Sequence, residues 1–269
     1  RYMQVTGVQT CALPILKAIS SFNSISLLLA VVALVAGMYF DGLRLQRLVK
    51  IGGYKLSIRA VLRVIFSNYF MAMLTPGASG GAVAQVLVLR SYGVPISKGT
   101  PIVLIRTVFS IMFLVIMLPL VFLRDAIEIP YISRDMLLIF AVLAVIAALV
   151  GTYILQTKYM RQFVYNLAQR FKAHNTKDWL SKLETLNQGL GLLYEQPVQS
   201  LIVFIESGLS LLCLYCIAPA LMYAFTPDIP IIDILDRMIL LNLILYFAPT
   251  PGGTGIAEGL FVVLFSAFV

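Results

Sequence analysis

The chain has 269 residues, of which 60% are hydrophobic and 12% charged, with a mean hydropathy of +0.95 and a formal net charge of +8. A soluble domain is about half apolar and about one quarter charged, so this composition excludes an ordinary soluble protein. The sequence instead predicts an all-α, polytopic integral membrane bundle. The single histidine, His174, lies in a polar segment and argues against a histidine-based metal site or triad. No catalytic residue, metal or cofactor is predicted.

The N-terminal residues do not read as part of the fold. Residues 5–15, VTGVQTCALPI, are similar to the translation of a sequencing-adapter oligonucleotide. We therefore expect residues 1–15 to be a non-native scar and exclude them from fold reasoning. We expect residues 16–269 to form one transmembrane domain, truncated at both ends, because Val269 falls inside an apolar run.

Four apolar runs are long enough to cross the hydrocarbon core, which requires about 20 residues of helix. They lie at residues 19–40, 100–123, 136–155 and 198–223. Two further stretches, 60–74 and 235–248, are short for a full crossing. Each runs into a Thr-Pro-Gly break and resumes as a second short helix, at 82–90 and 256–269. Both pairs are predicted to be re-entrant hairpins of two half-helices, because broken backbone at membrane depth must be buried in protein or line a wet cavity.

The charges between these runs predict the orientation. Residues 41–63 carry many bases and one acid, namely Arg44, Arg47, Lys50, Lys55, Arg59 and Arg63 against Asp41. The positive-inside rule places 41–63, 91–99 and 156–197 in the cytoplasm. The hairpin at 60–90 then enters from the cytoplasmic side and the hairpin at 235–269 from the outer side. The insert at 156–197 carries amphipathic patterning, which predicts either interfacial helices on anionic headgroups or helices packed on the ends of the bundle.

The two broken segments resemble each other in sequence. RVIFSNYFMAMLTPGASG, at 63–80, aligns with RMILLNLILYFAPTPGGTG, at 237–255, after a one-residue slip. In each copy an arginine precedes an asparagine, as Arg63 precedes Asn68 and Arg237 precedes Asn242. Together with their opposite predicted topologies, this similarity indicates an inverted repeat. Such repeats are common in secondary transporters, whose substrate lies near the midplane where half-helix ends meet.

The chemistry expected at the breaks comes mainly from the backbone. Glycines permit unusual dihedral angles and close approach of a ligand, and Pro76 and Pro251 prevent smooth continuation of the helix. Each second half-helix begins at mid-depth with unpaired N–H groups and a positive dipole end, which suit a phosphate. The alternative is a structural kink that packs helices through small residues. The break residues predicted to bind substrate are Thr75, Gly77, Ser79, Gly80, Gly81, Thr250, Gly252, Gly253, Thr254 and Gly255.

Ionisable side chains inside the apolar runs need partners. Arg106 and Glu206 are predicted at similar depths below the cytoplasmic surface and could pair, although snorkelling is an alternative for Arg106. Glu258, in the first turn after the second break, could cap that helix or meet an amine of a lipid headgroup. Its rough counterpart in the first copy is Gln85. The further residues predicted to bind substrate are Gln85, Arg106, Arg237, Asn242 and Glu258, although Asn68 and Asn242 could instead join helices.

The second break carries a family resemblance. PTPGGTGIAEG, at 249–259, is similar to the signature of the lysylphosphatidylglycerol synthase transmembrane region, also called the flippase-like domain family. LTPGASGGAVAQVLVLRSYGV, at 74–94, resembles the first conserved segment of that family, and the resemblance covers roughly 17–269. It implies a multi-pass protein of the bacterial plasma membrane. In fused relatives this region moves aminoacylated phosphatidylglycerol to the outer leaflet, and a separate soluble domain makes that lipid from aminoacyl-tRNA.

The resemblance and the breaks together favour a translocator of an anionic or aminoacylated phospholipid such as (lysyl-)phosphatidylglycerol. The alternative is the membrane portion of a phosphatidylglycerol lysyltransferase, which would contribute to lipid modification and to resistance against cationic peptides. A non-transporting scaffold is a third hypothesis. The longest polar stretch, 156–197, is shorter than an ordinary domain, so transferase chemistry cannot be assigned to these residues. The expected partners are a phospholipid substrate and membrane lipids, without direct nucleic-acid contact, and a homo-oligomer is allowed.

Overall fold

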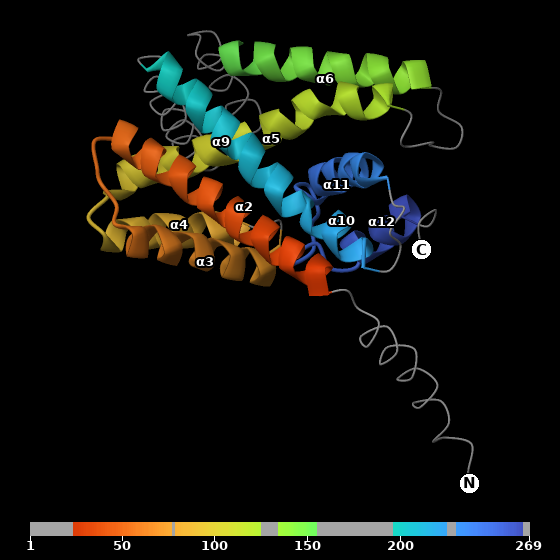
Figure 1. Cartoon of the computed structure of the whole chain (residues 1–269). Helices are drawn as coiled ribbons and strands as arrows, with labels where there is room; N and C mark the ends of the chain where they lie inside the picture. Colours follow the sequence, from red (N-terminus) through yellow and green to blue (C-terminus); the bar gives the residue numbers. More distant parts are fainter. Residues whose placement is uncertain (1–23, 77–78, 125–133, 155–195, 225–229, 266–269) are drawn as a thin grey trace, which may run out of the picture.

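The computed structural model describes residues 24–76, 79–124, 134–154, 196–224 and 230–265. The regular elements within these ranges are all α-helices, which confirms the predicted fold class (Figure 1). They are α2 (Ser24–Ile51), α3 (Ile58–Leu74), α4 (Ser79–Ser91), α5 (Ile96–Leu123), α6 (Arg134–Ile154), α9 (Pro197–Tyr215), α10 (Ile217–Met222), α11 (Ile231–Leu245) and α12 (Ile256–Phe265). The expected scar at 1–15 and residues 156–195 of the insert lie outside the described ranges.

Three helical stretches of the described chain are long and apolar enough to cross a membrane, namely Ser24–Ile51, Ile96–Leu123 and Pro197–Met222. The remaining predicted run, at 136–155, corresponds to α6, which has 21 residues. Large apolar side chains stay exposed along the helices, as Leu28 does on α2 at 63% and Phe70 on α3 at 65%. Water does not tolerate apolar surface on this scale, whereas lipid tails cover it. The protein is therefore a polytopic membrane protein.

Local sequence explains where α3 begins and ends. The hydroxyl of Ser57 accepts a hydrogen bond from the Ala60 N–H at 3.3 Å and caps the first turn. The helix ends at Leu74 because Thr75 precedes a proline, which disfavours helical backbone at the residue before it. Thr75 accordingly has an extended backbone, with φ −116° and ψ 144°.

Two helices differ from the runs that predicted them. The run at 198–223 is interrupted at Cys216, where α9 passes into α10 shortly before Pro219, a residue that clashes with the carbonyl of the preceding turn. The run at 19–40 is extended, because α2 continues to Ile51. Asp41 and Arg44 therefore lie inside α2, where both are buried and form an ion pair. The cytoplasmic placement of residues 41–63 stays a prediction.

The helices pack around α5, which contacts α2, α4, α6, α9 and α11. The helix α2 lies along α9, and α3 lies along α4 as a hairpin (Figure 1). The largest hydrophobic cluster joins α2, α3, α4, α5 and α9 through residues such as Leu45, Val64, Ile65, Leu89, Ile105 and Val203. This cluster fixes the α3–α4 hairpin against the long helices, and so positions the polar side chains described below.

The two Thr-Pro-Gly breaks meet in space. Pro76 and Pro251 form an isolated antiparallel β-bridge, and a Cβ added at Gly252 would lie 3.2 Å from the Met73 carbonyl oxygen. The half-helices on either side have 17 and 13 residues in the first copy and 15 and 10 in the second. Each is below the length of about 20 residues that a crossing requires. The breaks are thus in contact, while entry of the two hairpins from opposite leaflets stays a prediction.

Candidate functional site

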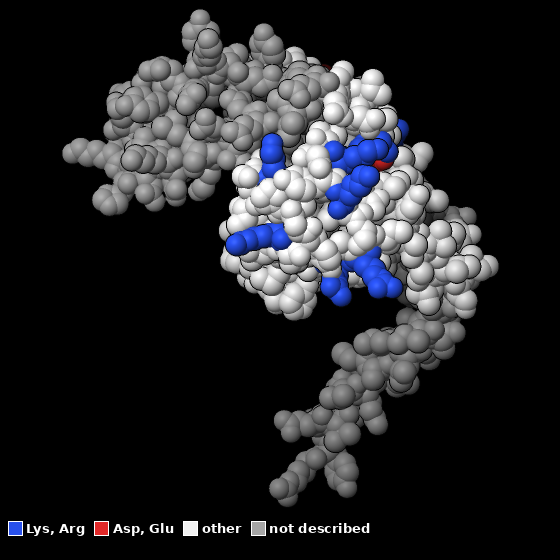
Figure 2. Space-filling view, turned by 90° about the vertical axis from the view of Figure 1, so that its left-hand side faces the viewer, with Lys and Arg blue, Asp and Glu red and all other residues white. Residues whose placement is uncertain are grey.

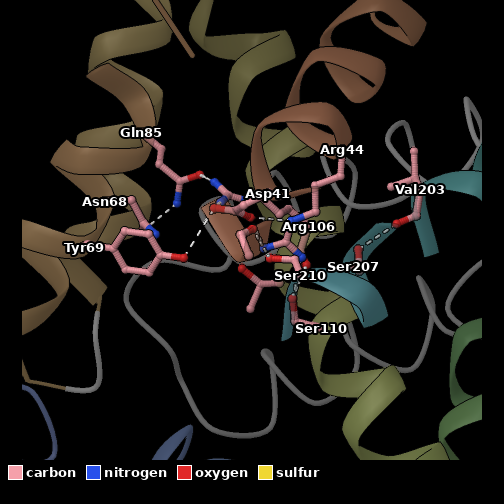
Figure 3. Close-up of polar contacts among 12 residues, drawn as sticks. Asp41, Arg44, Asn68, Tyr69, Gln85, Arg106, Ser110, Val203, Ser207 and Ser210 are labelled. Carbon is pink, nitrogen blue, oxygen red and sulfur yellow. Dashed lines mark hydrogen bonds and ion pairs between the residues drawn. The ribbon is translucent and has the colours of Figure 1, made fainter. Parts of the chain in front are cut away.

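Three charged side chains form a buried cluster where α2 meets α5 (Figure 3). Asp41 is fully buried on α2, and the guanidinium of Arg44, one turn later, lies 2.6 Å from its Oδ1. Arg106, on α5, donates from Nη2 to the other carboxylate oxygen of Asp41. Arg44 also donates from Nη1 to the hydroxyl of Ser110 on α5, at 2.8 Å. One carboxylate therefore holds two guanidinium groups from two different helices.

The α3–α4 hairpin completes this cluster with uncharged groups. Gln85 of α4 accepts a hydrogen bond from Arg106 Nη1 and donates from Nε2 to Asn68 Oδ1 of α3 at 2.7 Å. The hydroxyl of Tyr69, next along α3, lies 3.5 Å from Asp41 Oδ2. The close-up in Figure 3 shows Gln85, Asn68 and Tyr69 approaching the charged residues from the hairpin side. Polar groups of α2, α3, α4 and α5 thus converge on one point.

The charges of the buried cluster do not balance. Two guanidinium groups face one carboxylate, so Asp41, Arg44 and Arg106 carry a surplus of one positive charge. Within the described chain, Arg106 Nε is also buried without a hydrogen-bond partner. Removing an ion from water costs several kcal/mol unless other groups compensate for the lost hydration. The cluster therefore carries a net positive charge in a buried position.

A second ion pair joins α2 to the middle of α9. Arg47 of α2 donates from Nε and Nη2 to the carboxylate of Glu206, at 2.7–3.1 Å, and from Nη1 to Gln199 Oε1 at 2.9 Å. The predicted pairing of Arg106 with Glu206 is therefore wrong. The helix α2 lies along α9, and its Arg47 forms the ion pair with Glu206. Arg106 pairs instead with Asp41 of α2.

The residues of the first break mainly contact one another. Thr75 Oγ1 donates to the Met71 carbonyl and accepts from the Gly80 N–H, both at 2.8 Å. Ser79 Oγ donates to the Pro76 carbonyl at 2.9 Å. Gly80 and Gly81 allow close packing of the two half-helices. A Cβ at Gly80 would lie 2.5 Å from the Thr75 side chain, and one at Gly81 would lie 2.6 Å from Asn68 Oδ1. The predicted site residue Gly77 lies outside the described residues.

The second break relies on backbone conformation. Gly252, Gly253 and Gly255 have φ values of 59°, 74° and 81°, in the left-handed region that favours glycine. Thr254 Oγ1 donates to the Pro251 carbonyl at 2.8 Å. Glu258 Oε2 accepts from the Gly255 N–H at 2.6 Å, so the capping alternative for this residue is confirmed.

The remaining predicted residues of the second hairpin point elsewhere. Arg237 donates from Nη1 to the Leu264 carbonyl of α12, and Asn242 donates from Nδ2 to the Met238 carbonyl of its own helix, at 2.8 Å. The hydroxyl of Thr250 is buried without a hydrogen-bond partner among the described residues. Of the fifteen predicted residues, Gln85 and Arg106 enter the buried cluster. A ligand role for the others stays a prediction.

Sequence reasoning missed four members of the cluster, namely Asp41, Arg44, Tyr69 and Ser110. A signal for the first two was present in the sequence. Asp41 and Arg44 have the i, i+3 spacing of a helical ion pair, directly after an apolar run. Tyr69 and Ser110 carry no such signal, because their partners lie on other helices.

Comparison with known proteins matches the motif-based prediction. A family model described as Lysylphosphatidylglycerol synthase TM region matches residues 13–269. A protein named UPF0104 membrane protein, from Archaeoglobus fulgidus, is 22% identical over 266 residues, which cover 94% of this chain and 80% of that relative. No solved structure matches the chain at a significant level. The family match spans both hairpins and every residue of the buried cluster.

Proposed function

Since this chain belongs to the family of lysylphosphatidylglycerol synthase transmembrane regions, we propose that it moves an anionic or aminoacylated phospholipid, such as (lysyl-)phosphatidylglycerol, between membrane leaflets. The plasma membrane of a bacterium is the location that the family implies, although the relative named above is archaeal. The observation that carries this proposal is the surplus positive charge of the buried cluster on Asp41, Arg44 and Arg106.

The chemistry of a phospholipid headgroup complements this cluster. A phosphodiester carries one negative charge, which equals the surplus of two guanidinium groups over one carboxylate. Guanidinium binds phosphate oxygens through short, charge-assisted hydrogen bonds, and the buried Nε of Arg106 offers a further N–H donor. Asp41 and Gln85 fix the orientation of Arg106 from two sides. A headgroup phosphate bound there would lose its hydration, and the surplus positive charge of the cluster would compensate for that loss.

The N-termini of the half-helices are weaker phosphate sites than the sequence suggested. At the first break the Gly80 N–H is already bound by Thr75, and at the second the Gly255 N–H is bound by Glu258. A capped N–H group no longer offers its hydrogen bond to a ligand. The guanidinium cluster is therefore the preferred position for the phosphate, and the breaks contribute the small residues that let α4 approach α3.

A vesicle assay tests this function directly. Fluorescent phosphatidylglycerol is placed in both leaflets of liposomes containing the protein, and exchange is followed by quenching of the outer leaflet. Arg106→Gln leaves the Asp41–Arg44 pair intact and makes the cluster neutral. We expect exchange to slow by about tenfold or more, because hydrogen bonds to charged groups contribute about 1.5–3 kcal/mol and about 1.4 kcal/mol is a factor of ten.

The matched control is Arg124→Gln, at the other end of α5, where the side chain is 51% exposed and pairs with Asp236 at 3.4 Å. This variant should exchange lipid at the rate of the parent protein. No exchange by the intact protein would reject the proposed function. An Arg106→Gln protein that folds and exchanges lipid at the parent rate would remove the cluster from the mechanism.

The alternative function is the membrane portion of a phosphatidylglycerol lysyltransferase, with its contribution to cationic peptide resistance. The family description, which names a synthase, favours it. An assay for the formation of lysyl-phosphatidylglycerol from charged tRNA by the purified protein measures this alternative. Lipid synthesis without leaflet exchange would favour it over translocation.

A further inference from the structure

The α3–α4 hairpin carries an apolar groove on the face opposite the buried cluster. This groove of about 540 Å³ runs between the two helices, within the range of roughly 300–1,000 Å³ that small-molecule pockets occupy. Its walls include Phe70 and Met71 of α3, and Val83, Ala84 and Leu87 of α4. Gln85, by contrast, points from α4 into the cluster. The hairpin therefore presents a polar face inward and an apolar groove outward.

The groove opens toward the surroundings of the bundle. Phe70, Val83 and Leu87 have exposed fractions of 65%, 59% and 54%. Its inner end is formed by the polar residues of the first break, Thr75 and Ser79. In a protein that lies in a bilayer, an apolar groove of this kind is filled by hydrocarbon rather than by water.

The end of the groove that lies farther from the first break is basic. Arg63 precedes the lining residue Ser67 by one helical turn, which places it on the groove-facing side of α3. Arg90 lies in the last turn of α4, three residues after the lining residue Leu87. Arg63 donates from Nη1 to the hydroxyl of Tyr92, just after α4, at 2.7 Å. This bond holds its guanidinium across the open end of the hairpin.

The surrounding surface reinforces this positive charge. Figure 2 views the end of the molecule where α2 connects to α3 and α4 to α5, and shows Lys and Arg side chains over that face with very little acid. Residues 42–123 contain no aspartate or glutamate. The exposed basic residues of this stretch include Lys50, Lys55, Arg59, Arg63, Arg90 and Lys98.

The distance along α3 from the first break to Arg63 is close to the depth of one leaflet. Thr75 and Arg63 are separated by twelve residues of α3, or about 18 Å at a rise of about 1.5 Å per residue. Half of a hydrocarbon core about 30 Å thick is about 15 Å. An acyl chain that ends near Thr75 would therefore bring its own headgroup to the level of Arg63.

We propose that this groove binds one anionic phospholipid, with an acyl chain between α3 and α4 and the phosphate at Arg63 and Arg90. The apolar walls supply affinity for the chain, and the two arginines select a negative headgroup. The site lies on the outer face of the hairpin and is separate from the cluster on Asp41, Arg44 and Arg106. Occupancy does not depend on transport, so the two proposals can fail independently.

Photo-crosslinking tests this site on the full chain in nanodiscs. The probes are phosphatidylglycerol and phosphatidylcholine, each with a photoreactive group in the acyl chain, and labelled peptides are quantified by mass spectrometry. We expect phosphatidylglycerol to label the 67–88 segment preferentially. Ala84→Trp fills the groove and should abolish labelling of this segment by both probes. Arg63→Gln should reduce labelling by phosphatidylglycerol about fivefold, the equivalent of about 1 kcal/mol per basic residue near an anionic surface, and leave phosphatidylcholine labelling unchanged.

Three control variants distinguish binding in the groove from a general effect of a substitution on lipid labelling. Val142→Trp, on the exposed face of α6, adds the same side chain outside the groove, and Lys98→Gln removes a neighbouring charge. Both should label like the parent, as should Arg106→Gln, which alters the buried cluster. If Ala84→Trp does not give a folded protein, Leu87→Trp replaces it. Equal labelling of parent and groove-filled protein, or equal labelling by both headgroups, would overturn the proposal.

Discussion

The two broken hairpins share a sequence phrase but hold their breaks in different ways. In the first, side-chain contacts hold the break: Thr75 Oγ1 accepts a hydrogen bond from the Gly80 N–H, and Gly81 lets α4 approach Asn68. In the second, three glycines with positive φ bend the backbone itself. The same Pro/Gly pattern thus forms a junction held by side chains in one copy and a turn with left-handed glycines in the other.

The matched residues around the breaks show where the copies agree and where they diverge. Arg63 and Arg237 each bridge the open end of their hairpin, to the Tyr92 hydroxyl and to the Leu264 carbonyl. The asparagines differ, because Asn68 accepts a bond from Gln85 whereas Asn242 bonds its own helix. The frame of the hairpin is common to both copies, and the polar link to the buried cluster belongs to the first.

The largest expected difference between the halves concerns their buried carboxylates. Asp41→Asn leaves Arg44 and Arg106 buried without a counter-charge, and loss of one partner of a buried pair costs about 3–5 kcal/mol. Asp236→Asn breaks a pair at 3.4 Å whose arginine is half exposed, and should cost at most about 1 kcal/mol. Thermal unfolding of both variants in the same detergent measures the contrast. Equal losses would contradict the central role of the cluster.

A second contrast separates close packing from backbone conformation. A Cβ at Gly81 would lie 2.6 Å from Asn68 Oδ1 and 2.9 Å from the Asn68 carbonyl, so Gly81→Ala should cost about 1–3 kcal/mol. Gly255 has open space around it and a φ of 81°, so Gly255→Ala should cost about 1–2 kcal/mol through strain alone.

Asparagine distinguishes the two causes, because it is larger than alanine but tolerates left-handed backbone. Gly81→Asn should be less stable than Gly81→Ala, whereas Gly255→Asn should be more stable than Gly255→Ala. The free energy of unfolding of the four variants decides the matter. We also expect slower lipid exchange for Gly81→Ala, because displacing Asn68 disturbs Gln85. The same order of stabilities at both positions would show that the breaks are alike.

These contrasts also explain what the sequence could predict. The breaks were predictable because proline and glycine act locally: Pro76 sets the backbone of Thr75 wherever the segment lies in the fold. The cap by Glu258 follows from the same kind of local geometry. Partners across helices were not predictable in this way. Arg106 had a carboxylate available on α9 and another on α2, and the packing of α2 against α5 and α9 decides between them.

The smallest expected difference concerns the two threonines that precede and follow the breaks. Thr75 Oγ1 satisfies an N–H in the first turn of α4, whereas the exposed Thr254 bonds the Pro251 carbonyl. Thr75→Val keeps the shape and should cost about 1 kcal/mol, as loss of a helix cap does. Thr254→Val should change the free energy of unfolding by less than about 0.5 kcal/mol. If the uncapped Gly80 N–H instead became a phosphate donor, Thr75→Val would speed lipid exchange while lowering stability. A vesicle assay beside the unfolding measurement therefore tells whether the cap at the first break competes with substrate or only supports the fold.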